Sequence, residues 1–209
     1  MGIDTTIALI SLANAKEHLK ITTNIEDGLL GDFVNMVSAM VNSYIGRDLL
    51  QGNHTEYYDG NGEDTLMLKH SPVISVTKIY NSTVERIFDS TTELDLNLDV
   101  YVTKASGIIQ IIPAHGRGIG AFFNGKANLK VVYVGGYTLA TVPYDIQLAV
   151  RIWLGTVYMK YYNRRYEYIS ANTGQNSTTF VDKDMPLDVK RILDSYKDKL
   201  GVPQFAYKE

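Results

Sequence analysis

The segment 120–127, Gly-Ala-Phe-Phe-Asn-Gly-Lys-Ala, has the glycine and lysine spacing of a loop that binds nucleotide phosphates. The last position of that motif is a Ser or Thr that holds magnesium, and this chain has Ala127 there. A phosphate loop also leaves a strand and opens a helix, whereas residues 128–134 have the composition of a strand. The segment therefore predicts a loop between strands, and a small nucleotide-binding or ligand-binding enzyme is the less favoured alternative.

A second motif, Asp59-Gly-Asn-Gly-Glu-Asp64, resembles the beginning of a calcium-binding loop. The sixth position of such a loop needs Gly and carries Asp64, and the twelfth needs a bidentate Glu and carries His70. The Asp, Gly and Asn residues at 59–62 are also those that form tight turns between strands. We therefore expect a hairpin turn here rather than a cation site.

The remaining reactive residue types do not form a recognisable site. His18, His54, His70 and His115 fall in different predicted elements, and none has a His or carboxylate at i+3 or i+4. No Ser lies in a Gly-x-Ser-x-Gly turn, and the absence of cysteine excludes disulfides and thiolate ligands. We predict a protein that is not an enzyme and has no catalytic residues, no metal site and no cofactor.

Tyrosine is unusually frequent, with 15 residues, and five of them surround Arg164 and Arg165: Tyr158, Tyr161, Tyr162, Tyr166 and Tyr168. Tyr and Arg are the residues that anchor protein interfaces, and the same residues can stack on nucleic-acid bases. The 20 basic and 23 acidic residues give no overall basic field, which favours a protein interface over nucleic acid. Tyrosines that cap the wet edge of a helical core are a third interpretation.

Charge is spread unevenly along the 209 residues. Residues 1–150 carry 10 basic and 16 acidic side chains, and residues 151–209 carry 10 basic and 7 acidic ones. This contrast favours head-to-tail contact between copies or docking on an acidic surface, unless it reflects only solvated faces. Without a leader or an apolar run of about 18 residues, we expect a soluble, unprocessed chain.

Apolar residues at helical spacing predict two long helices. The first covers 24–46, with Asn24 as N-cap and Gly46 as the left-handed residue after the last turn. The second starts at Pro143 and ends near Arg164. Two shorter helices are predicted, one after the cap residue Ser11 and one from Pro186 to Gly201.

Residues between the long helices are rich in Thr, Val, Ile, Tyr and Gly, which predicts a β-rich meander. The expected strands are 55–58, 65–68, 73–80, 85–89, 100–104, 107–112 and 128–134. A Gly-rich connection is expected at 113–127, and residues 169–184 are polar and unpatterned, which predicts a mobile loop or one ordered by a partner.

This order of segments resembles the head-tail connector, or adaptor, proteins of tailed double-stranded DNA bacteriophages. The resemblance lies in Leu12–Leu19, Asp32–Tyr44 followed by Ile45-Gly46-Arg47, Tyr58–Gly62 with Leu66 and Leu68, Ser71-Pro72-Val73 with Ser75-Val76, and the helix from Val142 to Arg164. It implies an α+β fold in which a helical bundle of two long and two short helices carries a large β-rich insertion between the second and third helices. We expect the helical core at 1–50 and 141–201, the insertion at 51–140 and a C-terminal tail at 202–209.

The resemblance also implies a structural virion protein. About twelve copies would form an adaptor ring beneath the portal, in the neck of the virion, after assembly in the host cytoplasm. The ring would bind the portal and a downstream neck or tail protein, with no membrane, and would continue the channel through which double-stranded DNA passes without sequence-specific binding. Another neck protein, such as a stopper or tail-completion factor, is the alternative.

Two sets of residues are expected to serve this role. Phe205 and Tyr207, two tail aromatics with no visible core to join, are expected to bind the portal together with the basic final helix, and Arg164 and Arg165 are expected to bind it as well. A strongly basic channel lining would hold DNA, so polar or acidic loops are expected there. The loop residues Asn61, Glu63, Asp64 and Arg117 are the expected channel-facing positions.

Overall fold

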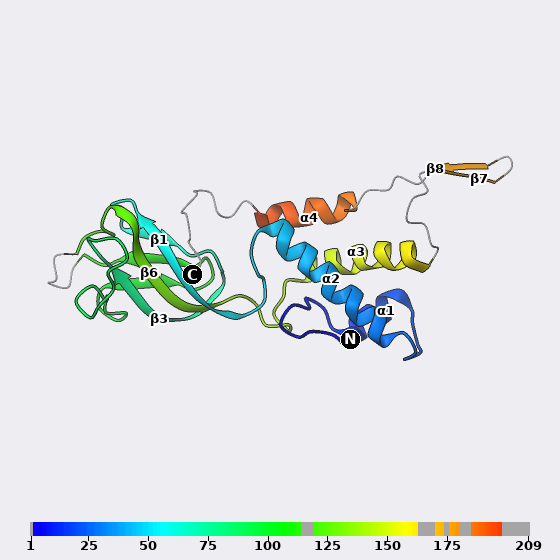
Figure 1. Cartoon of the computed structure of the whole chain (residues 1–209), viewed down its shortest axis with the longest axis horizontal. Coiled ribbons are helices and arrows are strands. Elements are labelled where there is room, and N and C mark those ends of the chain that lie inside the picture. Colours follow the sequence, from blue (N-terminus) through cyan, green and yellow to red (C-terminus); the bar gives the residue numbers. More distant parts are fainter. Residues whose placement is uncertain (1, 114–118, 163–169, 174–175, 180–184, 198–209) are drawn as a thin grey trace. The chain divides into compact units, whose positions relative to one another are not determined.

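A computed structural model describes residues 2–113, 119–162, 170–173, 176–179 and 185–197 (Figure 1). In chain order the elements are α1 (Leu12–Leu19), α2 (Asp27–Ile45), β1 (Gly52–Gly60), β2 (Thr65–Met67), β3 (Val73–Asn81), β4 (Val100–Thr103), β5 (Ile108–Ile111), β6 (Gly125–Gly135), α3 (Tyr144–Tyr162), β7 (Ser170–Thr173), β8 (Asn176–Thr179) and α4 (Leu187–Lys197). The predicted mixed α+β class is confirmed.

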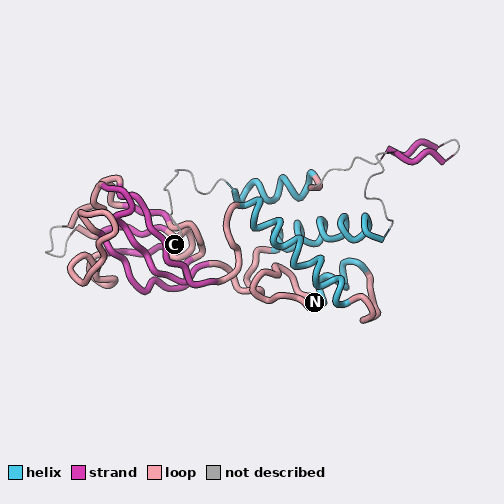
Figure 2. The backbone as a smooth tube through the Cα atoms, viewed as in Figure 1, coloured by secondary structure: helices cyan, strands magenta, loops and turns pink. Residues whose placement is uncertain are grey.

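The chain divides into two compact units. We call 1–46 with 139–199 the helical unit, and we call the unit that contains 47–138 the β unit. Figure 2 shows the helices gathered in the first and strands β1–β6 in the second.

Local signals account for the first two helices of the helical unit. The Ser11 side chain accepts a hydrogen bond from the Asn14 backbone N–H, so the predicted cap of α1 is confirmed. Gly46 ends α2 at φ 82°, also as predicted. The prediction that Asn24 caps α2 is wrong, because the helix starts at Asp27 and the Asn24 side chain instead accepts a hydrogen bond from Lys16 Nζ at 2.6 Å.

The core of the helical unit is made by the predicted apolar faces. In α2 the buried side chains recur at the spacing of an amphipathic helix, and α3 and α4 bury matching faces. The buried apolar residues are Leu30, Val34, Val37, Val41 and Ile45 of α2, Ile146, Ala149, Val150, Trp153 and Leu154 of α3, and Val189 and Leu193 of α4. The chain's single Trp therefore lies in this core.

The β unit contains two antiparallel three-stranded sheets rather than a meander. One sheet has the order β1-β6-β3 and the other β2-β5-β4. The predicted hairpin at 59–62 is wrong, since β1 pairs with β6 and β2 pairs with β5. The residues at 59–62 instead carry the chain from one sheet to the other, with Gly62 at φ 80°. Turn residues mark the end of a strand but do not choose its partner.

Both sheets contribute to one hydrophobic core in the β unit. Strand β6 supplies its alternating residues Leu129, Val131 and Tyr133, which are at most 1% exposed. The other members are Tyr58, Leu66, Leu68, Val73, Ile79, Leu94, Val100, Ile109, Ile111 and Phe122. This core fixes the position of the strand residues that form the polar network described below.

The β unit begins and ends at neighbouring backbone segments. Leu50 and Tyr137 form a parallel bridge, and the Gln51 N–H donates to the Tyr137 carbonyl at 2.8 Å. The Tyr137 N–H in turn donates to the Leu49 carbonyl at 2.7 Å. The chain therefore enters and leaves the β unit side by side.

Two local predictions are wrong. Residues 85–89 form no strand, because Arg86 takes a left-handed backbone (φ 54°), in which a strand cannot continue. Residues 169–184 were expected to form a loop without regular structure, yet β7 and β8 within them pair as antiparallel strands. Strand pairing there uses backbone groups, so a polar sequence gives no alternating hydrophobic signal.

Candidate functional site

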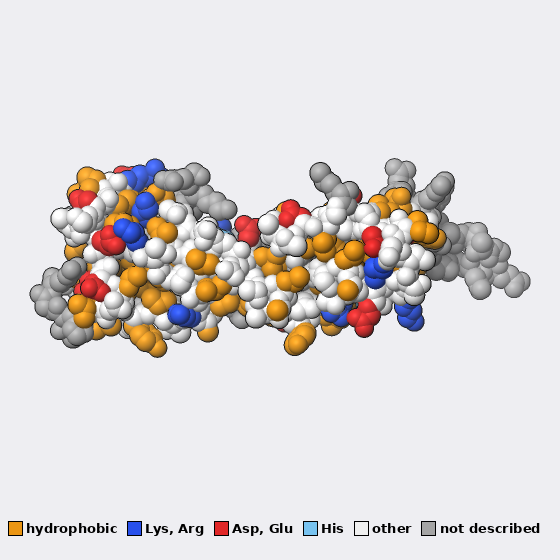
Figure 3. Space-filling model, turned by 90° about the horizontal axis from the view of Figure 1, so that it is seen from below, with side chains coloured by type: hydrophobic (Ala, Val, Ile, Leu, Met, Phe, Trp, Pro, Cys, Tyr) orange, Lys and Arg blue, Asp and Glu red, His pale blue; other side chains and the backbone are white. Residues whose placement is uncertain are grey.

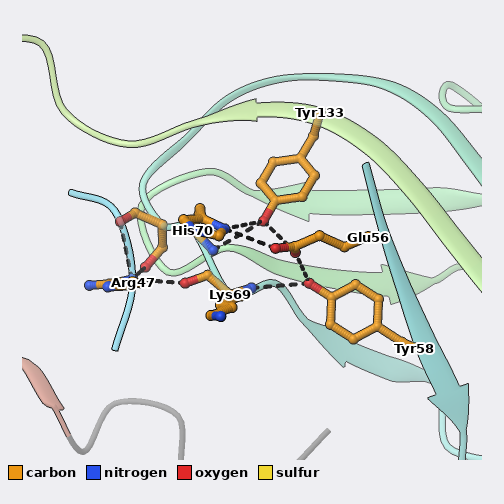
Figure 4. A network of polar contacts seen from close by, with 7 residues as sticks. Arg47, Glu56, Tyr58, Lys69, His70 and Tyr133 are labelled. Atoms are coloured by element: carbon orange, nitrogen blue, oxygen red, sulfur yellow. Dashed lines mark hydrogen bonds and ion pairs between the residues drawn. The ribbon is translucent and has the colours of Figure 1, made fainter. Parts of the chain in front are cut away.

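A buried polar cluster in the β unit is built around Glu56, a carboxylate only 2% exposed (Figure 4). Oε1 of Glu56 lies 2.9 Å from His70 Nδ1, and Oε2 accepts a hydrogen bond from the Tyr133 hydroxyl at 2.7 Å. The Tyr58 hydroxyl donates to the same Oε2. We call Glu56, Tyr58, His70 and Tyr133 the Glu56 network.

Strand periodicity and register place these side chains together. Glu56 and Tyr58 are two residues apart on β1 and so project from the same face, while Tyr133 lies on the adjacent strand β6. Two backbone hydrogen bonds attach the 68–71 segment to this pair of strands. The Lys69 N–H donates to the Tyr58 hydroxyl at 3.1 Å, and the His70 N–H donates to the Tyr133 hydroxyl at 3.0 Å.

The network keeps a buried carboxylate ionised. Burial raises the pKa of Glu56, but hydrogen bonds from His70, Tyr58 and Tyr133 outweigh this effect and bring the pKa to about 2. Burial, followed by the neighbouring negative charge, raises the pKa of Tyr133. The tyrosines therefore stay protonated and act as hydrogen-bond donors.

His54 lies on the edge of this network. Its ring stacks on the ring of His70, with centroids 3.8 Å apart and planes 6° apart. Burial and the charge of His70 lower the pKa of His54, and these effects exceed the opposing contributions of Glu56, a hydrogen bond to the Gly135 backbone and Asp48. Within the described residues, the buried Nε2 of His54 has no hydrogen-bond partner.

Arg47 anchors the other side of the 68–71 segment. Its NH1 group donates to the Lys69 carbonyl at 3.1 Å and to the Ser71 hydroxyl at 3.0 Å. The pKa of Arg47 is lowered by burial, although the guanidinium remains charged at neutral pH. The segment that carries His70 is thus held by the tyrosines on one side and by Arg47 on the other.

This arrangement suits stabilisation better than acid–base catalysis. The Glu56 carboxylate is saturated by three donors and is shielded from water, so it has no position from which to take a substrate proton. Helical ligand spacing, at i+3 or i+4, does not reveal this cluster. The detectable signal was alternation on a strand, His54-x-Glu56-x-Tyr58, whereas the contribution of His70 depends on the fold.

The expected channel residues that are described lie at the turn between the two sheets. Asn61 and Glu63 are exposed, and the Asn61 side chain accepts a hydrogen bond from the Glu63 N–H at 3.1 Å. Asp64 accepts from Gln110 Nε2 at 3.1 Å, and the hydrogen bonds from Gln110 and then Thr65 lower the pKa of its carboxyl. Arg117, Arg164, Arg165, Phe205 and Tyr207 lie outside the described residues.

The helical unit has an open groove of about 720 Å³. Trp153 and the Lys197 side chain line it, and the Lys197 ammonium lies 4.5 Å from the centre of the Tyr44 ring. The remaining lining residues are Met36, Ala39, Met40, Ser43 and Met185. Methionine-rich surfaces adapt to different partners because the thioether side chain is flexible.

Helix α3 also has apolar side chains on the face opposite the core. Tyr144 is 88% exposed, Leu148 47%, Met159 58% and Tyr162 65%. At 3.6 residues per turn these four positions fall on one side of the helix, so they form a stripe, which we call the outer face of α3. Figure 3 shows hydrophobic side chains at the surface of the helical unit between scattered charged ones.

Solved structures similar to this fold include chains of gene transfer agent particles. The chain matches a chain in "Neck of empty GTA particle computed with C6 symmetry" with a TM-score of 0.57 and 16% identity, covering 94% of this chain and 92% of the other. Chains in "Virion of native gene transfer agent (GTA) particle" and "Neck of native GTA particle computed with C12 symmetry" match over the same shares, with TM-scores of 0.57 and 0.55 and identities of 15% and 16%. At these identities the similarity establishes the fold.

Sequence comparison establishes the family. The profile of the head completion protein family matches residues 8–199, and the chain belongs to that family. It is therefore a structural protein of the phage neck rather than an enzyme. This confirms the predicted resemblance to head-tail connector proteins and the prediction that the protein is not an enzyme. No curated protein matches the chain by sequence. Among the described helices, none has the length and apolar content needed to span a membrane.

Proposed function

We propose that this head completion protein is the adaptor that joins the portal to the next neck or tail protein. About twelve copies form a ring that continues the DNA channel, and double-stranded DNA passes through it without sequence-specific binding. Assembly takes place in the host cytoplasm before the ring becomes part of the virion neck. Membership of the head completion family supports this role.

The outer face of α3 is the observation that carries the proposal. A helix that is apolar on two sides normally buries both, and in the single chain the four outer-face side chains stay exposed, although α1 approaches the middle of this face at Gly155. In a closed ring each subunit offers two different surfaces to its neighbours, so a second apolar surface is required. The outer face, roughly 27 Å long at 1.5 Å per residue, forms the centre of this subunit contact.

The two units have separate tasks in this proposal. The helical unit supplies the ring contacts, and the insertion at 51–140 supplies the channel-facing turn. The turn with Asn61, Glu63 and Asp64, together with Arg117, faces the channel. The two exposed residues of this turn, Asn61 and Glu63, carry no positive charge, so this turn would not retain DNA phosphates.

Portal binding is assigned to the C-terminal part of the chain. Arg164 and Arg165 supply positive charge, and Phe205 and Tyr207 supply aromatic anchors on the tail at 202–209. Aromatic and Arg side chains contribute most of the binding energy in protein interfaces, so a few such residues are sufficient.

A charge on the outer face of α3 tests the ring. Leu148→Asp places a carboxylate in the proposed contact, whereas Leu187→Asp changes an exposed leucine (51%) on α4 and serves as the matched control. With purified portal, wild type and Leu187→Asp should give a ring of about a dozen copies by native mass spectrometry. Leu148→Asp should remain a folded monomer by circular dichroism, and ring formation by this variant would overturn the assigned contact.

The position of the protein in the neck requires a separate experiment. Wild-type protein and a variant that lacks residues 202–209 are each mixed with immobilised portal and with immobilised tail protein. The adaptor role predicts that wild type binds portal and that the truncated protein, still folded, does not. Binding to tail protein alone would instead assign the chain as a stopper or tail-completion factor.

A further inference from the structure

We propose that His54, Glu56 and His70 form a binding site for a divalent transition metal ion, for which Zn²⁺ is the best match. The site lies in the β unit and is independent of the adaptor role. One nitrogen from each histidine and one carboxylate oxygen lie within 4.8 Å of one another. Two imidazoles and a carboxylate are a donor set that zinc accepts, with a water molecule in the fourth position.

The free nitrogen of His54 is the central observation. His54 makes a hydrogen bond to the Gly135 backbone, and its Nε2 is buried without a partner among the described residues. We assign the contact with the Gly135 backbone to Nδ1–H, which leaves a lone pair on Nε2. This is the arrangement of most metal-binding histidines, in which a backbone carbonyl holds the second nitrogen and fixes the tautomer.

A glycine lies beside this nitrogen. A Cβ at position 52 would lie at van der Waals distance, 3.5 Å, from Nε2 and Cε1 of His54. Residue 52 therefore packs no side chain against the Nε2 side of the ring. His54 is also partly exposed, whereas Glu56 and His70 are buried, so a metal ion enters past the His54 ring.

Binding requires a rotation of His54. The two rings are parallel, and lone pairs on ring nitrogens lie in the ring plane, so they do not converge on one point. With metal–nitrogen distances of about 2.1 Å, tetrahedral ligand atoms are roughly 3.4 Å apart. His54 therefore turns off the stack and brings Nε2 toward His70 and Glu56. His70 Nδ1 releases to solvent the proton that bonds it to Glu56, and the ion takes the place of that proton between Nδ1 of His70 and Oε1 of Glu56, while the tyrosines stay on Oε2.

A purely structural interpretation of the cluster does not account for the unpartnered Nε2 atom of His54. The pair of Glu56 and His70, with the two tyrosines, already satisfies the carboxylate. His54 adds a stacked ring to that arrangement, and any flat apolar ring could do the same. A metal site instead requires the Nε2 atom, so the two interpretations differ in what His54→Phe does.

Isothermal titration calorimetry with Zn²⁺ at pH 7.5 distinguishes the metal-site interpretation from the purely structural one. Wild type should bind one Zn²⁺ per chain, with a rise in melting temperature that EDTA reverses. Loss of a second-shell partner alone weakens metal binding 10–100-fold, so His54→Phe should weaken it by at least about 100-fold. His18→Phe, which removes an exposed histidine on α1, should bind as wild type does.

Two results would overturn the site. One is the absence of stoichiometric Zn²⁺ binding to the wild type. The other is equal binding by wild type and His54→Phe, which would assign the ion to other residues. If His54→Phe does not fold, His54→Gln provides the same comparison, and NMR signals of the ring nitrogens in the wild type must shift at His54 when Zn²⁺ is added.

Discussion

The imidazole rings of His54 and His70 lie face to face, with their centroids 3.8 Å apart and their planes 6° apart. His54 is on strand β1 and His70 is on the segment between β2 and β3, so the stack joins a strand of one sheet to the segment that connects the two sheets. Glu56 lies beside the stack, with its Oε1 atom 2.9 Å from Nδ1 of His70. Changes in this small region should therefore affect the stability of the whole β unit.

Acid should destabilise the metal-free protein through Glu56. Its folded-state pKa of about 2 is below the ordinary value of 4.5, so its contribution is present above pH 4.5 and is lost as the pH falls toward 2. The shift corresponds to about 3 kcal/mol at most. Urea unfolding at several pH values in EDTA should show this loss, and the gap between wild type and Glu56→Gln should close as the pH approaches 2. A gap that stays constant would contradict the assignment.

Removal of the Tyr133 hydroxyl should be costly. The hydroxyl donates to Glu56 and accepts from the His70 N–H, so Tyr133→Phe leaves two buried groups short of a partner. We expect a loss of about 1–3 kcal/mol in the free energy of unfolding. Tyr101→Phe on β4, where the side chain is 61% exposed, is the matched control and should change stability by less than about 0.5 kcal/mol.

Gly135 should not tolerate a side chain. A Cβ at this position would lie 2.2 Å from the His70 carbonyl oxygen, which the neighbouring contacts hold in place. Gly135→Ala should cost more than about 3 kcal/mol and disturb the stack of histidines. Gly120→Ala, whose Cβ would meet nothing within 4 Å, should leave the melting temperature unchanged. A stable Gly135→Ala protein would show that the 68–71 segment can move.

Leu193 should anchor α4 to the helical unit. Its side chain is fully buried, whereas Leu187 on the same helix is 51% exposed. Leu193→Ala should cost about 2–5 kcal/mol, and Leu187→Ala should remain within about 0.5 kcal/mol of wild type. Hydrogen exchange should show faster exchange in α4 of the first variant. Equal exchange in both variants would mean that α4 is held by its polar contacts.

The helices were predictable because the apolar residues of each helix repeat at helical spacing along its buried face. Leu30, Val34, Val37 and Val41 repeat at three and four residues, and this spacing alone defines the core face of α2. The cap at Ser11 and the end at Gly46 were likewise local signals. The start of α2 was misplaced because Asn24 had a different partner, Lys16, which only the tertiary structure brings near.

Pairing of the strands could not be predicted in the same way. The composition of 52–60 and 125–135 marks both as strands, but the register of β1 against β6 depends on the shared core. For the same reason the three members of the histidine and glutamate cluster were visible only as separate residues. Their proximity follows from β1 and from the segment that carries His70.

The parallel bridge between Leu50 and Tyr137 has a consequence for how such proteins diversify. A segment whose two ends meet can be lengthened, exchanged or removed as one module without altering the path of the helices on either side. A short peptide could close the gap in its place. Mechanical load on the module is also divided between two adjacent chain crossings that are hydrogen bonded to each other, so neither crossing carries it alone.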